Sequence, residues 1–297
     1  MVSQGYGPSA KRLSHFGAGI SLGPFKNADA ETACKRLLER FSFVGVRDIP
    51  SLRRARELAP HVNSQLTFDL APLLLALDVR PRRRQPVEGL GVVLRGLATT
   101  SAGGQLRETR RLESIASAIK QLFASGLIDN VVLLDFSRER SCIDSLLHDR
   151  LSRLLPKHLP VRRVRYTSDP LTMLSEISRL QALLAMRLHA SVFGYLTGVP
   201  SVTLSYHEKC TAWCAMIGQD RALVLEAEEA GSTDLARALR AALLGSAAPP
   251  SVTISDAFDR ALSNWTWHME PSAATAARAT FVNRFAPGMP RACSAAD

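Results

Sequence analysis

The chain has 297 residues, of which 46% are hydrophobic, and its 37 Lys and Arg against 27 Asp and Glu give a formal net charge of +10. A chain of this size can bury a large core in one or two domains. It contains no run of 18 apolar residues and no apolar segment of a secretory signal near its N-terminus, so we expect no membrane-spanning helix. The positive charge favours an anionic partner, although arginines scattered along helices account for much of it.

The five cysteines are odd in number and scattered along the chain. Cys210 and Cys214 have only His207 beside them, and no second cluster completes a zinc site. We therefore expect reduced thiols, no metal and no cofactor, in a cytoplasmic protein.

Apolar runs alternate with helical patterns in the first part of the chain. The predicted elements are a short strand with a glycine turn within 16–25, a helix at 28–41 capped by Asn27, a strand at 43–46, a helix at 52–58 and a strand at 66–70. Arg47 and Asp48 follow the second strand, and Asp69 ends the third. Open α/β sheets bind ligands at the carboxyl ends of their strands, so these three residues are candidate substrate ligands. In the alternative interpretation, Arg47 and Asp48 pair with each other and Ser51 caps the helix.

A basic, proline-flanked segment at 78–86 marks the best domain boundary. We expect a partial first domain at 1–78, a linker at 79–88, a second domain at 89–250, and a C-terminal helix and tail at 251–297. The arginines at 82–84 favour a solvated linker. A peripheral contact with an anionic membrane surface, at the inner face of the membrane, is the alternative. No aromatic residues interleave with the basic ones, so nucleic acid is not expected.

The second half is more regular. The predicted strands lie at 90–94, 130–136, 161–166, 180–185, 200–204 and 222–225, and the helices between and after them at 109–125, 144–155, 171–179, 191–197, 206–218, 233–244 and 254–269. Strands and helices alternating at this spacing predict βαβ units and a doubly wound parallel sheet, which is an α/β fold.

The chain is organised around the segment that contains Arg187 and His189, where a strand runs directly into a helix. This arrangement places the helix N-terminus at the edge of the sheet. The Arg187 side chain offers a planar fork for a carboxylate or phosphate, and His189 can carry or give a proton near neutral pH. Together they predict an anion site with an acid or base beside it. A histidine buried in the core is the alternative for His189.

Other strand ends add to this predicted site. Arg95 ends an earlier strand, and Ser205, Tyr206 and Lys209 follow a later one. Strand ends in one parallel sheet meet at one edge, so we expect Arg95, Arg187 and His189 to surround one ligand together. A structural salt bridge is the alternative for Arg95, and an exposed lysine at a helix start is the alternative for Lys209.

Several of these segments resemble the polysaccharide pyruvyl transferases. Residues 186–209, MRLHASVFGYLTGVPSVTLSYHEK, are similar to the family's R-L-H element, its G-V-P strand entry and its S-Y-x-x-K loop. Upstream, GPFKN at 23–27, VRD at 46–48 with Ser51, and Asp69 with Ala71 and Leu73 resemble the family's G-P-F, V-R-D-x-x-S and D-x-A-x-L elements in order and spacing. The resemblance covers residues 17–218.

The resemblance implies two Rossmann-like domains, similar to the GT-B glycosyltransferases, with a first domain shortened relative to other members. It also implies transfer of the pyruvyl unit of phosphoenolpyruvate, the donor substrate, onto a sugar of a polysaccharide or lipid-linked glycan intermediate, as a ketal. Arg187 would bind the donor anion and His189 would act as the general acid, so these two would be the catalytic residues. Arg95 would be a second anion ligand. A nucleotide-sugar glycosyltransferase and a non-catalytic remnant that binds glycan or a partner remain alternatives.

Overall fold

The computed structural model describes residues 15–77, 88–96, 102–138 and 144–269, together with the single residues 273 and 276. By their contacts the described residues fall into two units, the first within Met1–Leu73 and Phe258–Thr280, the second within Leu74–Ala257 and Phe281–Asp297. The linker expected at 79–88 lies outside the described residues except for Glu88, and so do the arginines at 82–84. Most of the expected tail lies outside them too.

The first unit is built on a parallel sheet with the strand order β1-β2-β3. Its described elements are β1 (His15–Ile20), α1 (Ala28–Leu38), β2 (Phe41–Val46), α2 (Ile49–Leu58), β3 (Asn63–Leu66) and the start of a 3-10 helix, η1 (Ala71–Leu77). Asn27 caps α1 as expected, because its side-chain oxygen accepts a hydrogen bond of 2.9 Å from the backbone N–H of Ala30.

The strand predicted at 66–70 was placed too late in the chain. The strand that pairs with β2 is β3, whose sequence NSQL contains one apolar residue. Apolar periodicity missed it because β3 pairs with β2 alone among the described strands and is mostly exposed. The apolar Phe68 is buried in the segment that follows. Asp69 therefore lies beyond the strand end, in that segment.

Helix α9 (Ile254–Thr266) belongs to the first unit from Phe258 onward. The fully buried Asn264 on this helix accepts hydrogen bonds of 2.9 Å from the backbone N–H of Gly19 and from the hydroxyl of Thr67. The contact requires glycine at position 45, because a Cβ there would lie 2.0 Å from the Asn264 side-chain oxygen. The Asn264 side chain on α9 thus links β1, the first strand of this sheet, to the segment that directly follows β3, its last strand.

The second unit contains a six-stranded, wholly parallel sheet with the order β6-β5-β4-β7-β8-β9. Its strands are β4 (Glu88–Val93), β5 (Val131–Leu134), β6 (Val161–Val164), β7 (Leu180–Ala185), β8 (Ser201–Ser205) and β9 (Val224–Glu226). In chain order this is the 3-2-1-4-5-6 arrangement of doubly wound Rossmann sheets. The predicted α/β class is confirmed, and β7 has the predicted bounds.

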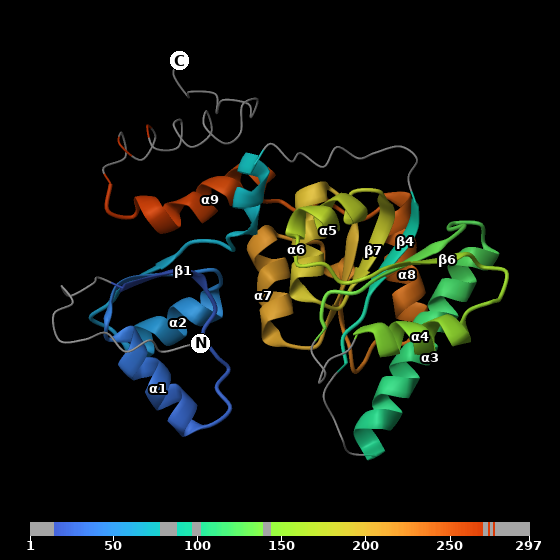
Figure 1. Ribbon diagram of the computed structural model, residues 1–297, viewed down its shortest axis with the longest axis horizontal. Coiled ribbons are helices and arrows are strands. Elements are labelled where there is room, and N and C mark those ends of the chain that lie inside the picture. Colours follow the sequence, from blue (N-terminus) through green and yellow to red (C-terminus); the bar gives the residue numbers. More distant parts are fainter. Residues whose placement is uncertain are drawn as a thin grey trace. The chain divides into compact units, whose positions relative to one another are not determined.

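Two sets of helices cover this sheet (Figure 1). One set packs around the long helix α3 and consists of α3 (Ala102–Ala124), α4 (Asp144–Leu154) and α8 (Ser232–Leu244). The other set follows α6 and consists of α5 (Pro170–Ile177), α6 (Leu188–Thr197) and α7 (Glu208–Ile217), with a 3-10 turn η3 (Arg221–Leu223) before β9. Both faces of the sheet are therefore buried, which explains the nearly continuous apolar runs of its central strands.

Helix α6 packs tightly against β8. A Cβ on Gly194 would lie 2.1 Å from the Ser201 hydroxyl, so glycine permits this close approach. The helix ends at Thr197, as predicted, and its C-cap Gly198 adopts a left-handed conformation with φ 68°. This packing fixes the end of α6 that carries the R-L-H segment.

None of the helices in the described ranges is long and apolar enough to cross a membrane.

Candidate functional site

Two predicted anion ligands lie where the strand order of the second unit reverses. Arg95 comes two residues after β4, and Arg187 comes two residues after β7. These strands are parallel neighbours on the two sides of the switch point. Ligands of open α/β sheets bind outside the carboxyl ends of the strands at such a switch point.

Arg95, Tyr206 and Lys209 come together at this edge. The Nη1 atom of Arg95 donates a hydrogen bond of 2.6 Å to the Tyr206 hydroxyl, and its guanidinium carbon lies 4.6 Å from the ring centroid. The Lys209 ammonium lies 5.6 Å from the same centroid. The Nε atom of Arg95 is buried and has no hydrogen-bond partner among the described residues. Two cations therefore converge on one phenol.

The electrostatics of Tyr206 place Arg187 in the same group. Burial raises the pKa of the Tyr206 hydroxyl, while the nearby charges of Arg95 and Arg187 act in the opposite direction. Because the net shift is upward, the hydroxyl stays protonated at neutral pH and can donate a hydrogen bond. We call Arg95, Arg187, Tyr206 and Lys209 the cationic cluster.

Arg187 is held by a partner that the sequence did not reveal. Its guanidinium forms hydrogen bonds to both carboxylate oxygens of Asp144, with Nη2 at 2.5 Å and Nε at 3.2 Å. Asp144 is fully buried at the start of α4 and also accepts a hydrogen bond of 2.8 Å from the backbone N–H of Phe136. The fork is thereby oriented, and much of the Arg187 charge is balanced.

His189 occupies the first turn of α6 and is exposed, so it is not the buried core histidine of the alternative interpretation. It lines a pocket of about 140 Å³ at the ends of β5 and β6. The other lining residues are Asp135, Phe136, Tyr166, Thr167, Ser168, Pro170, Met173 and Phe193. No member of the cationic cluster is among these described lining residues, so His189 and the cluster occupy adjoining parts of the strand edge.

Asp135, at the end of β5, carries a network that the sequence analysis missed. Its carboxylate lies 2.6 Å from Nδ1 of the fully buried His148 and 3.1 Å from Nη2 of Arg163. Because Nε2 of His148 accepts the backbone N–H of Leu94 at 3.2 Å, the imidazole proton sits on Nδ1 and is donated to Asp135. Burial alone would raise the pKa of Asp135, but the hydrogen bonds from His148 and Arg163 outweigh it and hold the pKa below its usual range. The strand-end rule used for Arg95 applies equally to Asp135.

Ser205 lies inside β8 as its last residue and is buried, rather than following the strand as predicted. His207 caps α7 by accepting the backbone N–H of Lys209 at 3.3 Å. Among the residues expected around β8, Tyr206 and Lys209 thus join the cationic cluster, while the Ser205 side chain is enclosed by protein.

In the first unit, the three predicted substrate ligands bond to their own neighbourhood. Arg47 forms an ion pair of 2.8 Å with Asp69. Asp48, rather than Ser51, caps α2, accepting the backbone N–H of Ser51 and the hydroxyl of Ser21, each at 2.8 Å. The alternative interpretation was therefore wrong in both details, because Arg47 pairs with Asp69 and the capping group is a carboxylate.

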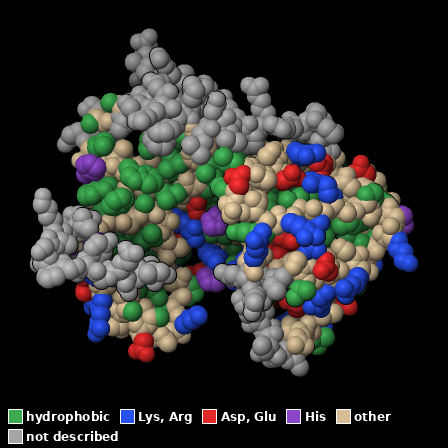
Figure 2. All heavy atoms as spheres, in the orientation of Figure 1, with side chains coloured by type: hydrophobic (Ala, Val, Ile, Leu, Met, Phe, Trp, Pro, Cys, Tyr) green, Lys and Arg blue, Asp and Glu red, His purple; other side chains and the backbone are tan. Residues whose placement is uncertain are grey.

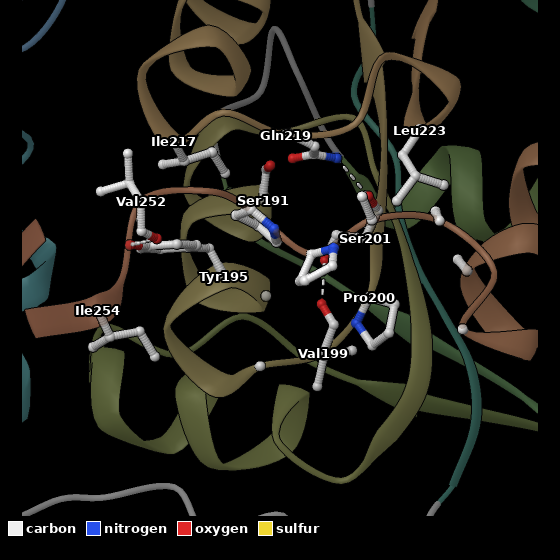
Figure 3. A pocket seen from close by; sticks show the side chains of 18 of the residues that line it. Ser191, Tyr195, Val199, Pro200, Ser201, Ile217, Gln219, Leu223, Val252 and Ile254 are labelled. Atoms are coloured by element: carbon white, nitrogen blue, oxygen red, sulfur yellow. Dashed lines mark hydrogen bonds between the residues drawn. The ribbon is translucent and has the colours of Figure 1, made fainter. Parts of the chain in front are cut away.

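A separate apolar cavity of about 450 Å³ lies at the opposite end of α6 from His189 (Figure 3). The Tyr195 hydroxyl there lies 3.0 and 2.9 Å from the carbonyl oxygens of Val252 and Thr253, and the Gln219 amide donates to the carbonyl of Ser201 at 2.7 Å. The described residues that line this cavity include no charged side chain. An anionic ligand fits the opposite edge of the sheet, where the cationic cluster lies. On the face drawn in Figure 2, Lys and Arg side chains are exposed among acidic ones.

A sequence model of the family described as polysaccharide pyruvyl transferase matches residues 10–208. The chain belongs to the polysaccharide pyruvyl transferase family. The matched range includes the R-L-H segment and Tyr206, and it ends one residue before Lys209. No curated protein matches the chain in sequence.

Solved structures resemble this member of the family at low similarity. The UDP-GlcNAc 2-epimerase of Methanocaldococcus jannaschii, in complex with UDP-GlcNAc and UDP, gives a TM-score of 0.49 at 13% identity, covering 74% of this chain and 60% of its own. The trehalose-6-phosphate synthase OtsA gives a TM-score of 0.46 at 13% identity, covering 90% of this chain and 66% of its own. TarM gives a TM-score of 0.49 at 10% identity, covering 92% of this chain and 50% of its own. Likenesses this low carry no argument about function, and the fold assignment rests on the two parallel sheets.

The described residues contain no group of three His, Cys, Asp or Glu side chains that could hold a metal ion. The described side chains at the strand edge supply guanidinium, ammonium, phenol, imidazole and carboxylate groups.

Proposed function

We propose that the protein transfers the pyruvyl unit of phosphoenolpyruvate to a sugar of a glycan or lipid-linked saccharide, as a ketal. The observation that carries this proposal is the position of the R-L-H segment. In a chain of the pyruvyl transferase family, it puts Arg187 at the switch point of the second sheet, beside Arg95 and with His189 on the adjoining helix turn.

The cationic cluster suits the donor's charge. Phosphoenolpyruvate carries a carboxylate and a phosphate, and planar guanidinium forks bind both groups in bidentate fashion. Asp144 orients Arg187 and balances much of its charge, and Arg95 and Lys209 add two further cations to the cluster. The protonated Tyr206 hydroxyl adds a neutral donor between them. Helix α6 contributes the positive end of its dipole at the same edge.

His189 then acts as the general acid. It protonates the enol carbon C3 of the donor, and the adjoining C2 becomes electrophilic. One sugar hydroxyl adds to C2 and gives its proton to the imidazole of His189, which restores the acid. A second hydroxyl of the same sugar displaces the phosphate from C2 and gives its proton to the departing group. The products are a pyruvate ketal of the sugar and inorganic phosphate, and the fixed cations stabilise the charge on the leaving phosphate.

A thermal-shift titration tests the donor. A ligand that binds only the folded state raises the melting temperature by mass action. We expect phosphoenolpyruvate to raise it, and Arg187→Ala to remove the increase. The matched control is Arg240→Gln, because Arg240 is an exposed arginine on α8 that lines none of the pockets described above. A shift with UDP- or GDP-sugars alone would indicate a nucleotide-sugar glycosyltransferase, and no shift with either would indicate a non-catalytic protein.

A further inference from the structure

A second polar pocket, of about 640 Å³, adjoins the His189 pocket in the second unit. Two serines line it, together with three arginines, two carboxylates and one phenol. The arginines are Arg138, Arg163 and Arg165, the carboxylates are Asp135 and Asp149, and the phenol is Tyr166. These residues come from the ends of β5 and β6 and from the facing side of α4. We call this hollow the arginine pocket.

Among the described residues, one of the three arginines pairs with the protein's own carboxylates. Arg163 forms ion pairs with Asp135, at 3.1 Å, and with Asp149. In the described part of the chain, Arg138 and Arg165 form no ion pair, and both are exposed. The Arg138 guanidinium lies 5.1 Å from the centroid of the Tyr166 ring. The pocket therefore presents two guanidinium groups to a ligand, with an aromatic ring beside one of them.

The arginine pocket and the His189 pocket share a wall. Asp135 and Tyr166 line both of them. A ligand that fills the arginine pocket thus places its neighbouring group next to His189. None of the cationic cluster's described residues lines the arginine pocket, so this anion site is separate from the one assigned to the donor.

From this arrangement we propose that the arginine pocket binds the phosphate of a glycosyl phosphate or diphosphate acceptor and holds its sugar against Tyr166, facing His189. The inference rests on the proposed function, since it names the acceptor of that reaction. Arg138 and Arg165 supply forks that match phosphate oxygens, and such charge-assisted hydrogen bonds discriminate strongly against a neutral glycan. The acceptor is then a sugar still attached to its carrier through phosphate, and the carrier is a lipid or a nucleotide.

The first experiment titrates the full-length protein with inorganic pyrophosphate by isothermal calorimetry, in the presence of saturating phosphoenolpyruvate. We expect pyrophosphate to bind, and Arg165→Gln and Arg138→Gln each to raise its dissociation constant about tenfold or more, the loss typical of one charge-assisted hydrogen bond. Arg240→Gln removes the same charge from an exposed site on α8 and should leave the constant unchanged. Both pocket arginines are exposed, so melting temperatures should match the wild type.

The second experiment compares conjugates. Glucose 1-phosphate should bind, glucose should not, and Arg165→Gln should abolish the difference. Tighter binding of UDP-glucose identifies a nucleotide carrier, and tighter binding of a citronellyl-diphosphate-linked glucose identifies a lipid carrier. Either result supports the proposal.

Three results would overturn it. The first is equal pyrophosphate affinity in Arg165→Gln and wild type, which would mean an adventitious ion only. The second is complete competition between pyrophosphate and phosphoenolpyruvate. The third is loss of phosphoenolpyruvate binding in Arg165→Gln, which would place the donor in the arginine pocket. Failure of phosphoenolpyruvate to bind the wild type at all would instead refute the proposed function, so the two failures are distinguishable.

Discussion

Asp144 holds the guanidinium of Arg187 through both carboxylate oxygens, although 43 residues separate the two in the chain. The carboxylate is fully buried and the guanidinium nearly so, with exposed fractions of 0% and 14%. A buried ion pair of this kind changes the folding free energy little while both partners are present. Removing one partner lowers the stability strongly, because the other charge is left buried without compensation. Asp144 therefore acts as a positioning residue for the fork that we assign to the donor.

Asp144→Asn should destabilise the second unit and weaken donor binding together. Loss of the charge leaves Arg187 uncompensated in a buried site, which should lower the free energy of unfolding by about 3 kcal/mol. Denaturant unfolding measures this change, and titration with phosphoenolpyruvate measures the affinity. Asp234→Asn is the matched control, because its pair with Arg237 is largely exposed, and it should change stability by less than about 0.5 kcal/mol. Equal effects of the two substitutions would contradict the role of Asp144.

Arg187→Lys should raise the dissociation constant of phosphoenolpyruvate about tenfold or more, because an ammonium cannot replace a bidentate fork. The lysine ammonium of this variant should also bind Asp144 less tightly than the arginine does. Calorimetric titration checks the affinity, with Arg237→Lys as a surface control. Unchanged affinity would show that Arg187 serves only the ion pair with Asp144.

His189→Ala should lower the rate of phosphate release from phosphoenolpyruvate by about 10²-fold or more, the usual contribution of a general acid. The melting temperature should stay nearly the same, since this side chain is exposed on the first turn of α6. A phosphate-release assay with a glycan acceptor and a thermal melt measure the two quantities. Retained activity with a large fall in stability would assign His189 a structural role.

Acid should weaken the second unit through Asp135. Its pKa is lowered in the folded protein, so its contribution to stability is present above the unfolded pKa of about 4 and is lost as the pH falls through the lower folded value. The groups that face it are His148 and Arg163, and Asp149 shares Arg163. Unfolding free energies of wild type and Asp135→Asn, measured from pH 7 down to pH 3, should converge as the pH falls. A constant difference over this range would contradict the prediction.

Cys214 should resist alkylation in the folded protein. Burial raises its pKa to about 11, so at pH 8 only about one thiol in a thousand is the reactive thiolate. Burial also raises the pKa of Cys210. Peptide mass spectrometry after brief treatment with iodoacetamide should find both unmodified in native protein and modified after unfolding. Rapid modification of native Cys214 would show that the thiol is accessible.

Much of the second unit could be predicted from its sequence because its strands are buried on both faces and punctuated by capping residues. The bounds of β7 and the C-terminal end of α6 at Thr197 are examples. The strand β3 could not be located in this way, since it pairs on one side only and contains a single apolar residue. Local hydrophobicity does not encode which edge a polar segment will pair with.

The sequence indicated part of this arrangement of side chains for a similar reason. Strand-end positions brought Arg95 and Tyr206 together, because the ends of parallel strands must meet. The partner of Arg187 could not be found, since Asp144 lies at the start of a helix rather than after a strand. Such pairings depend on how a helix packs over the sheet, which short motifs do not specify.

Helix α9 has a consequence for the order of folding during synthesis. Asn264 on this helix binds Gly19 and Thr67, which lie 245 and 197 residues earlier in the chain, and Trp267 stacks on Phe43 with ring centroids 4.5 Å apart. The ribosome therefore completes all six strands of the second sheet before it makes the last part of the first unit's core. Domains usually fold in N- to C-terminal order as they emerge. We therefore expect the second unit to become stable first, and the strands β1 to β3 to complete their packing only once α9 leaves the ribosome.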